Sequence, residues 1–305
     1  MREHDEGLLN GITPDRIRDH IRALEGVRHP LAAPEALERA AGYIRETFGS
    51  LGYPVADHLF MDGGREFANI IATHTGGSKS GRRVLVVAHY DTVTTTPGAD
   101  DNASGVAVLL ELATILKCLR FERCLQFVAV TLEENEDEHN PRDLGTRGSR
   151  ALAAHARREG WEIEGAVVLE SVAYAGDAVV QRTPAGIPFT VPATGNFIGV
   201  IGNEASRGMV DRFGQAVGSR EAGLPWVPLV VPGNGGLLPD SRRSDHAPFW
   251  DHGYKAIMLT DTTNFRNPHY HQPSDTLETL NLDFAVQVCR ATAALLLDIA
   301  KASEP

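Results

Sequence analysis

The sequence predicts an α/β fold with a mixed, mostly parallel central sheet flanked by helices on both faces. Three apolar runs have the composition of buried strands: Val84 to Ala88, Leu125 to Leu132 and Ala166 to Leu169. Segments with helical periodicity lie around them, and this alternation is typical of parallel α/β sheets. The length of 305 residues and the hydrophobic content of 42% suit one domain covering residues 1–305, since no linker divides the chain.

Two helices and a hairpin are predicted first along the chain. Thr13-Pro14 is a typical helix start, in which a capping residue precedes a proline in the first turn. A second helix is expected from about Pro34 until Gly52 stops it. Val55 to Phe60 and Phe67 to Ala72 are expected to pair as antiparallel strands around the turn at 62–64, at one edge of the sheet.

Later segments give a less even pattern. Residues 104–119 predict a mostly apolar helix that packs on the sheet, and residues 281–299 predict a closing helix with one apolar face. Between them, residues 181–243 are rich in proline and glycine, with one amphipathic helix expected near 209–217. Within this region, residues 234–240 form either a rim over the site or a flexible surface connection.

Residues 84–105 carry the strongest chemical signal, because an apolar strand leads directly into a histidine, three aspartates and a glycine turn. His89 and Asp91 lie two residues apart and so point to the same side of an extended chain. The carboxylate can then accept a hydrogen bond from the imidazole and orient it for a metal. After Pro97-Gly98, the run Asp100-Asp101-Asn102 returns a second carboxylate to this strand end.

Acidic residues also follow the other two buried runs. Glu133 and Glu134 come directly after Leu132, and Glu170 follows Leu169. Because the binding crevice of such a sheet lies at the carboxyl ends of its strands, these acids are expected to cluster. His271 adds a second histidine source near the other end of the chain. Together these residues predict a metal site.

These motifs resemble those of the M28 family of zinc peptidases, the aminopeptidases with two metal ions, over most of the chain. His89-Tyr90-Asp91 matches the family's first histidine ligand and its orienting aspartate. Asp101, in Asp101-Asn102-Ala103-Ser104-Gly105, matches the aspartate that bridges both ions. Glu133-Glu134 matches the adjacent pair in which the first glutamate is the general base and the second a ligand.

The resemblance also assigns Glu170 to one metal and His271 as the last histidine ligand. It therefore implies two zinc ions per chain, with Glu133 and Asp91 as catalytic residues. The five implied ligands are His89, Asp101, Glu134, Glu170 and His271. A cis peptide bond between Asp101 and Asn102 is implied as well.

The residue types suit this chemistry. Imidazole and carboxylate ligands bind zinc, and a bridging carboxylate holds two ions about 3.5–4 Å apart. A water between the ions has its pKa lowered to about 7, and Glu133 takes the proton and passes it to the leaving amine. Glu133 and Glu134 are expected on an extended chain end, where neighbours point in different directions. Because protons compete with the metal for its ligands, a neutral to mildly alkaline optimum is expected.

Composition narrows the class of partner. The net charge of −11 disfavours nucleic acid and anionic membranes, both of which favour a basic face. No stretch approaches the roughly 20 apolar residues of a membrane span. A peptide or amino-acid derivative is therefore the expected substrate, and the oligomeric state stays open. The sequence as given is expected to be cytoplasmic, or secreted if a leader was trimmed.

Some residues keep two interpretations. Asp245 and His246, beside a run that resembles family sequence near the substrate pocket, are either substrate-binding residues or a helix cap and its neighbour. His269 is interpreted as a neighbour of His271. The acidic segment 135–143 is longer than the family's usual connection; it is either a solvated loop or a cover over the cleft, and it leaves Glu136 as an alternative ligand to Glu134.

The three cysteines, Cys118, Cys124 and Cys289, are predicted to be buried free thiols rather than disulfides or zinc ligands.

Three functions remain to be weighed. The favoured one is a two-zinc exopeptidase, most simply an aminopeptidase. The second is an acyltransferase of glutaminyl-cyclase type with one zinc, and the third a non-catalytic binding domain of the same fold. An aminopeptidase needs a negative or carbonyl-lined spot for the α-ammonium, whereas a carboxypeptidase needs an arginine. Arginines stand near the candidate pocket segments at Arg182, Arg242, Arg243 and Arg266.

Overall fold

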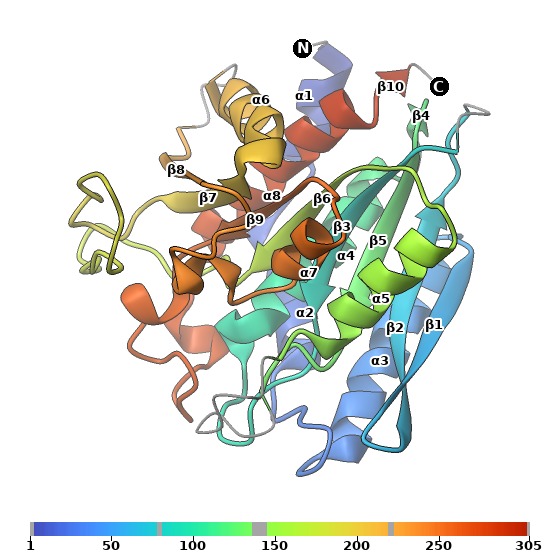
Figure 1. The fold of residues 1–305 in the computed structure, drawn as a ribbon, viewed down its shortest axis with the longest axis horizontal. Coiled ribbons are helices and arrows are strands. Elements are labelled where there is room, and N and C mark those ends of the chain that lie inside the picture. Colours follow the sequence, from blue (N-terminus) through green and yellow to red (C-terminus); the bar gives the residue numbers. More distant parts are fainter. Residues whose placement is uncertain (1–2, 78–80, 136–144, 219–222, 304–305) are drawn as a thin grey trace.

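An eight-stranded mixed sheet forms the centre of the computed structural model, which describes residues 3–77, 81–135, 145–218 and 223–303 (Figure 1). In spatial order the strands are β1 (Val55–Asp62), β2 (Arg65–His74), β5 (Cys124–Val130), β3 (Arg83–His89), β6 (Ile163–Glu170), β9 (Ala256–Thr260), β7 (Ile198–Asn203) and β8 (Trp226–Val231). The central strands β5, β3, β6 and β9 are parallel. The hairpin of β1 and β2 is antiparallel and lies at one edge, as predicted. At the other edge, β7 and β8 run antiparallel to β9.

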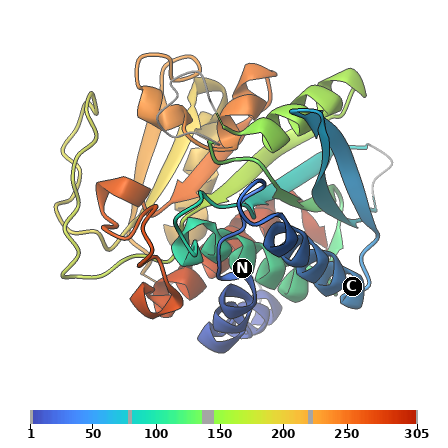
Figure 2. The same ribbon diagram turned by 90° about the horizontal axis from the view of Figure 1, so that it is seen from below.

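Helices cover both faces of this sheet (Figure 2). They are α1 (Glu3–Asn10), α2 (Pro14–Leu24), α3 (Pro34–Ser50), α4 (Gly105–Leu116), α5 (Arg147–Arg158), α6 (Arg207–Gly218), α7 (His246–Asp251) and α8 (Leu282–Ile299). One face packs against α3, α4, α6 and α8, with α2 outside α4 and α8; the other packs against α5 and α7. This arrangement confirms the predicted fold class. None of the helices within the described residues has the length and apolarity needed to cross a membrane.

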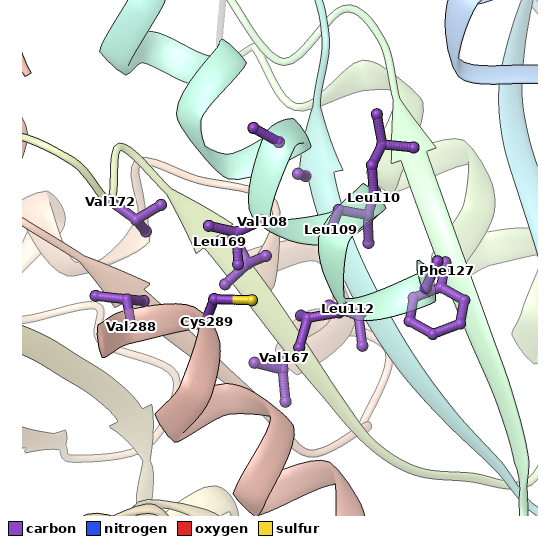
Figure 3. Close-up of a cluster of buried hydrophobic side chains, with 14 of the residues drawn as sticks. Val108, Leu109, Leu110, Leu112, Phe127, Val167, Leu169, Val172, Val288 and Cys289 are labelled. Carbon is purple, nitrogen blue, oxygen red and sulfur yellow. The ribbon is translucent and has the colours of Figure 1, made fainter. Parts of the chain in front are cut away.

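Helix α4 lies at the middle of the larger core. Its apolar side chains contact strands β5 and β6 on one side and α8 on the other, where Val108 and Leu112 approach Cys289 (Figure 3). All but one of its residues are buried, because the sheet, α2 and α8 surround it. A helix that is apolar on every side suits such a place. Its first residue, Gly105, follows the turn that delivers Asp101, so the core fixes that turn.

One charged residue of α4 is buried with a partner. Glu111 is fully buried, and the Arg16 guanidinium of α2 donates to its Oε1 at 2.6 and 3.1 Å. Arg16→Met is expected to lower the free energy of unfolding by about 3 kcal/mol, because it leaves a buried carboxylate without its counter-ion. Denaturant unfolding measures the change. The double variant Arg16→Met/Glu111→Leu is expected to recover most of the loss, and a double variant as unstable as the single one would contradict this explanation.

The predicted helices occur with small changes in their ends. Helix α2 begins at Pro14, α3 covers 34–50, and α8 is capped by Asn281, whose side chain accepts from Phe284 N at 3.0 Å. Helix α4 ends at Leu116 rather than at residue 119, so Cys118 lies in the following turn and is exposed. The prediction of a buried thiol is therefore wrong for Cys118 and right for Cys289, while Cys124 is half-buried. All three are free thiols.

Two further predictions need correction. Strand β5 stops at Val130, and Leu132 has a φ of +56°, so Glu133 and Glu134 follow a bend instead of an extended chain end. The region 181–243, expected to hold one helix only, also contains β7 and β8. Strand β7 was missed because two of its six residues are glycines, which interrupt its apolar pattern. Gly202 lies close to α6, since a Cβ there would lie 2.8 Å from Val210 Cγ2. Pro228 interrupts β8, which tolerates it as an edge strand.

Candidate metal centre

The central strands bring the predicted ligands together. His89 ends β3, Glu170 ends β6, and Glu133 and Glu134 follow β5 by three and four residues. Because β5, β3 and β6 are parallel neighbours, their carboxyl ends lie side by side at the same end of the sheet. Asp101 comes to the same place through the short helical turn η1 (Ala99–Ser104). The peptide bond between Asp101 and Asn102 is cis, which confirms that prediction.

Among the described residues, three groups of three possible ligand atoms lie at this end of the sheet. The first two share Asp101, and the third joins His89 to Glu133 and Glu134. In the first, His89 Nε2 lies 3.3 Å from Asp101 Oδ1 and 3.5 Å from Glu170 Oε1. In the second, His271 Nε2 lies 3.2 Å from Asp101 Oδ2 and 3.4 Å from Glu134 Oε2. Each carboxylate oxygen of Asp101 thus faces a different histidine. This is the placement that a carboxylate between two cations requires.

The donor set fits divalent metal ions. In the part of the chain that the structure describes, His89 Nε2, Asp101 Oδ1 and Glu134 Oε1 are buried and form no hydrogen bond. Buried polar atoms normally have partners, and a cation among them would supply one. Two imidazoles and three carboxylates are the ligand types of zinc sites. Their role as ligands stays a prediction, and the alternative ligand Glu136 lies outside the described residues.

The pKa values reflect this concentration of carboxylates. Burial lowers the pKa of His89, but the charges of Glu170 and Glu133 outweigh burial and raise it well above its ordinary value. Burial opposes the same effect at His271, where Glu134 and Asp101 raise the pKa to about 12. Burial raises the pKa of Glu133 well above its usual range, against the opposing charge of His89. Burial thus disfavours the ionised form of Glu133, and a cation beside it would favour that form.

Buried polar side chains hold these ligands from behind. Asp91 Oδ1 lies 3.5 Å from His89 Nδ1, which makes no hydrogen bond within the described residues, so its orienting role stays a prediction. Asp91 accepts from the main-chain N–H groups of Glu133 and Glu134 at 3.2 and 3.1 Å. Asp275 accepts from the N–H groups of Asp100 and Asp101 at 2.9 and 3.2 Å. Side chains near one ligand thus position the main chain of the next.

Glu170 is held by two residues that the sequence reasoning missed. Asn102 donates to Leu169 O at 2.9 Å and accepts from Ser171 N at 3.0 Å, so it binds the main chain on both sides of Glu170. Ser244 donates from Oγ to Glu170 Oε2 at 2.6 Å. Asn102 directly follows Asp101 in the motif of residues 101–105, and this position could have indicated its supporting role.

A cavity of about 100 Å³ opens beside the ligands. Asp101, Glu133 and Glu170 line one end. Its other walls are mainly apolar: Ile187, Ile201, Leu229, Leu238, Met258 and Phe265. Leu238 and Asp240 come from the segment 234–240, so part of this segment forms a wall of the cavity, as one of its two interpretations expected.

Tyr270 and Arg243 also line the cavity. Arg243 is one of the four arginines that the sequence placed near the pocket, whereas Tyr270 had no predicted role. The Tyr270 ring stacks on His271 with 3.8 Å between centroids, and its hydroxyl accepts from Arg243 Nη2 at 3.3 Å. Burial and the charges of Asp101 and Glu134 raise the pKa of Tyr270 well above its ordinary value. The hydroxyl therefore stays protonated and can donate.

The other arginines near the pocket bind main-chain or acidic groups elsewhere. Arg182 donates to Asn264 O, and Arg242 pairs with Asp251 at 2.7 Å. Arg266 donates to Phe197 O at 2.8 Å and to Gln181 Oε1 at 2.8 Å.

Asp245 and His246 lie below the cavity surface, which is lined by their neighbours Arg243 and Ser244. Asp245 precedes α7 but makes no side-chain capping bond, and both of its carboxylate oxygens are buried without a hydrogen bond among the described residues. His246 Nε2 bonds to Ser241 O at 2.7 Å, and its ring packs edge-on against Trp250. Their assignment as substrate-binding residues stays a prediction. His269 bonds to Ser274 Oγ at 2.9 Å, away from the ligand groups.

The fold places the chain among α/β proteins that resemble zinc peptidases. The aminopeptidase from Aneurinibacillus sp. strain AM-1 superposes with a TM-score of 0.73 at 18% identity, covering 98% of this chain and 97% of that one. A glutaminyl cyclase from Macrostomum lignano gives 0.74 at 20% identity, covering 99% and 94%. At these identities the likeness shows the fold alone.

Sequence comparison then gives the family. The chain belongs to peptidase family M28, whose model matches residues 69–296. Uncharacterized protein YfbL of Escherichia coli is 33% identical over 93% of this chain and 88% of its own length. Curated relatives named aminopeptidases or probable zinc metalloproteases are 25–28% identical, and the chain spans 42–58% of their length.

Proposed function

We propose that this protein is a two-zinc aminopeptidase. The observation that carries the proposal is Asp101, which presents one oxygen to the His89 group and the other to the His271 group. A single-zinc glutaminyl cyclase would need only one such group. A non-catalytic domain of the same fold would not need to keep both.

Bound zinc ions would supply Lewis-acid polarisation of the scissile carbonyl and a water of lowered pKa. Glu133 is suited to be the base, because it lines the cavity and its Oε2 lies 4.0 Å from His89 Nε2, farther than the nearest oxygens of Asp101 and Glu170. It accepts a proton from the attacking water and passes it to the leaving amine. The Tyr270 hydroxyl can donate to the carbonyl oxygen as negative charge develops there.

The charge of the cavity favours a substrate with a free α-ammonium. Asp101 and Glu170 would be neutralised as zinc ligands, which leaves the carboxylates of Glu133 and Asp240 in the lining against the guanidinium of Arg243. The apolar walls contributed by β7, β8 and β9 then receive the side chain of the first residue. We infer a preference for substrates whose N-terminal side chain is apolar and fits the cavity.

Two measurements test the proposed function. Purified protein is analysed for bound metal, and hydrolysis is compared between amino-acid arylamides and their N-acetylated forms. Two zinc ions per chain and cleavage of the free-amine substrates are expected, with loss of activity on chelation and recovery with zinc or cobalt. One ion with cyclisation of N-terminal glutamine would favour the glutaminyl-cyclase alternative, and no bound metal would favour a binding domain.

The apolar pocket predicts a change of specificity. Leu229→Phe fills part of the cavity from the edge strand β8, so kcat/KM for leucyl arylamide is expected to fall about tenfold relative to alanyl arylamide, since pockets discriminate by roughly 10–200-fold per methylene. The ratio of the two kcat/KM values is the measurement. Val227→Phe, on the same strand but outside the cavity lining, is the control and is expected to leave the ratio unchanged. An equal ratio in both variants would mean that the cavity does not hold the side chain.

A further inference from the structure

Arg28 is a buried arginine close to the metal centre. It lies in the loop between α2 and α3, before the segment 69–296 that the family model matches. The residue is 2% exposed. Within the described residues its guanidinium makes five hydrogen bonds, and every acceptor is a main-chain carbonyl oxygen. A guanidinium offers several donors in a rigid plane, so it can fix several chain segments at once.

Three of the five acceptors lie on the two segments that carry His89 and Asp101. Nε donates to Tyr90 O at 2.8 Å, directly after His89. Nη1 donates to Pro97 O at 2.9 Å and Nη2 to Gly98 O at 3.0 Å, three to four residues before Asp101. The remaining acceptors are Leu24 O at the end of α2 and Gly26 O of its own loop. One side chain therefore joins the strand end to the turn that returns the shared carboxylate.

The main chain of Arg28 strengthens this connection. Its N–H donates to Thr92 Oγ1 at 2.8 Å, and its carbonyl accepts from Thr92 N at 3.3 Å. The packing around the guanidinium is tight, since a Cβ on Gly98 would lie 3.0 Å from Nη2 and 2.4 Å from Asp101 O. Gly98 also has a φ of +61°, which favours glycine. Neither segment can shift without moving the other.

The charge of Arg28 also faces the centre. Burial lowers the pKa of Arg28 to about 10, while the nearby charges of Asp91, Asp275 and Asp101 oppose that effect. The guanidinium remains a cation at neutral pH and lies behind the carboxylates of the site. It reduces the repulsion among them without occupying a ligand position.

We propose that Arg28 is a positioning residue for the metal centre, holding the segments of His89 and Asp101 at the separation that a shared carboxylate requires. The inference rests on the proposed two-zinc function. A purely structural arginine would support the fold alone, so the test must separate metal affinity from stability.

The test compares Arg28→Lys with Arg290→Lys. Lysine keeps the charge but loses the planar fork. Arg290 is the matched control, because its guanidinium also donates to main-chain carbonyls. Its acceptors are Leu9 O of α1 and Ile12 O of the turn after it, at 3.1 Å each, instead of the ligand segments. Zinc affinity is measured by competition with a chromogenic chelator, and stability by thermal unfolding of the metal-free proteins.

Arg28→Lys is expected to lower zinc affinity at least tenfold, as loss of groups that orient ligands does. Arg290→Lys is expected to stay within about twofold of the parent protein even where the two variants lose similar thermal stability. Arg28→Lys with the parent's affinity for both ions would overturn the proposal. So would an equal loss of affinity in the control.

A milder variant covers the case in which Arg28→Lys does not fold. Thr92→Val removes the acceptor for Arg28 N while keeping the side-chain shape, and it is expected to weaken zinc binding about threefold or more. Unchanged affinity in Thr92→Val would then overturn the proposal. Measurements on the parent protein separate the proposed aminopeptidase function from the proposed role of Arg28. If the parent protein bound two zinc ions but did not hydrolyse peptides, the proposed function would be rejected, and the zinc affinities of the Arg28 variants could still be compared.

Discussion

Glu133→Gln is expected to keep both zinc ions and to lose roughly 10³-fold in kcat, since general-base catalysis contributes about 10²–10⁴-fold. Glu133 lines the cavity, and its carboxylate is farther from His89 Nε2 than the nearest oxygens of Asp101 and Glu170. The amide has the same shape but cannot accept the proton of the attacking water. Substrate binding should change little, so the loss belongs in kcat rather than in KM.

Glu134→Gln is the matched comparison, because the same chemical change falls on the adjacent residue. Its Oε2 lies 3.4 Å from His271 Nε2, within the second ligand group. Zinc content and steady-state kinetics of the two variants are measured side by side. Glu134→Gln is expected to lose zinc and activity together. If Glu133→Gln lost zinc to the same extent, the assignment of Glu133 as the base and Glu134 as the ligand would be wrong.

The clustering of the candidate ligands could be predicted because its signal is local. His89 and Glu170 end buried strands, and parallel neighbouring strands place their carboxyl ends together whatever the intervening sequence. The spacing of His89 and Asp91 likewise depends only on an extended backbone. In such a sheet, position along the strand determines position in the site.

The parts that were missed depend on contacts between distant segments. Strand β7 has Gly202 where Val210 of α6 approaches, and its glycines leave Ile198, Val200 and Ile201 as its apolar residues, too few for a clear strand pattern. The bend at Leu132 follows from Asp91, which binds both N–H groups of the glutamate pair from another loop. Neither contact leaves a signal in a short window of sequence.

The supporting residues show the same limit. Arg28 precedes the site by some 60 residues of chain and acts through main-chain carbonyls, which any sequence provides. Tyr270 and Arg243 meet the cavity only after the loops around 243 and 270 pack together. Motif reasoning finds the candidate ligands and a neighbour such as Asp91, whereas supporting groups from distant segments require the folded chain.

Asp101→Asn is expected to remove both zinc ions, which distinguishes Asp101 from every other ligand. Its two oxygens lie 3.3 Å from His89 Nε2 and 3.2 Å from His271 Nε2, so each belongs to a different ligand group. The amide offers one oxygen and no negative charge, and the remaining pairs, His89 with Glu170 and His271 with Glu134, are incomplete zinc sites. Stoichiometry and affinity are measured by titration with zinc against a competing chelator. Glu170→Gln and Glu134→Gln serve as controls, and each is expected to weaken only the ion of its own group. If Asp101→Asn retained one ion at the parent's affinity, Asp101 would be a terminal ligand and the two groups would not be joined through it.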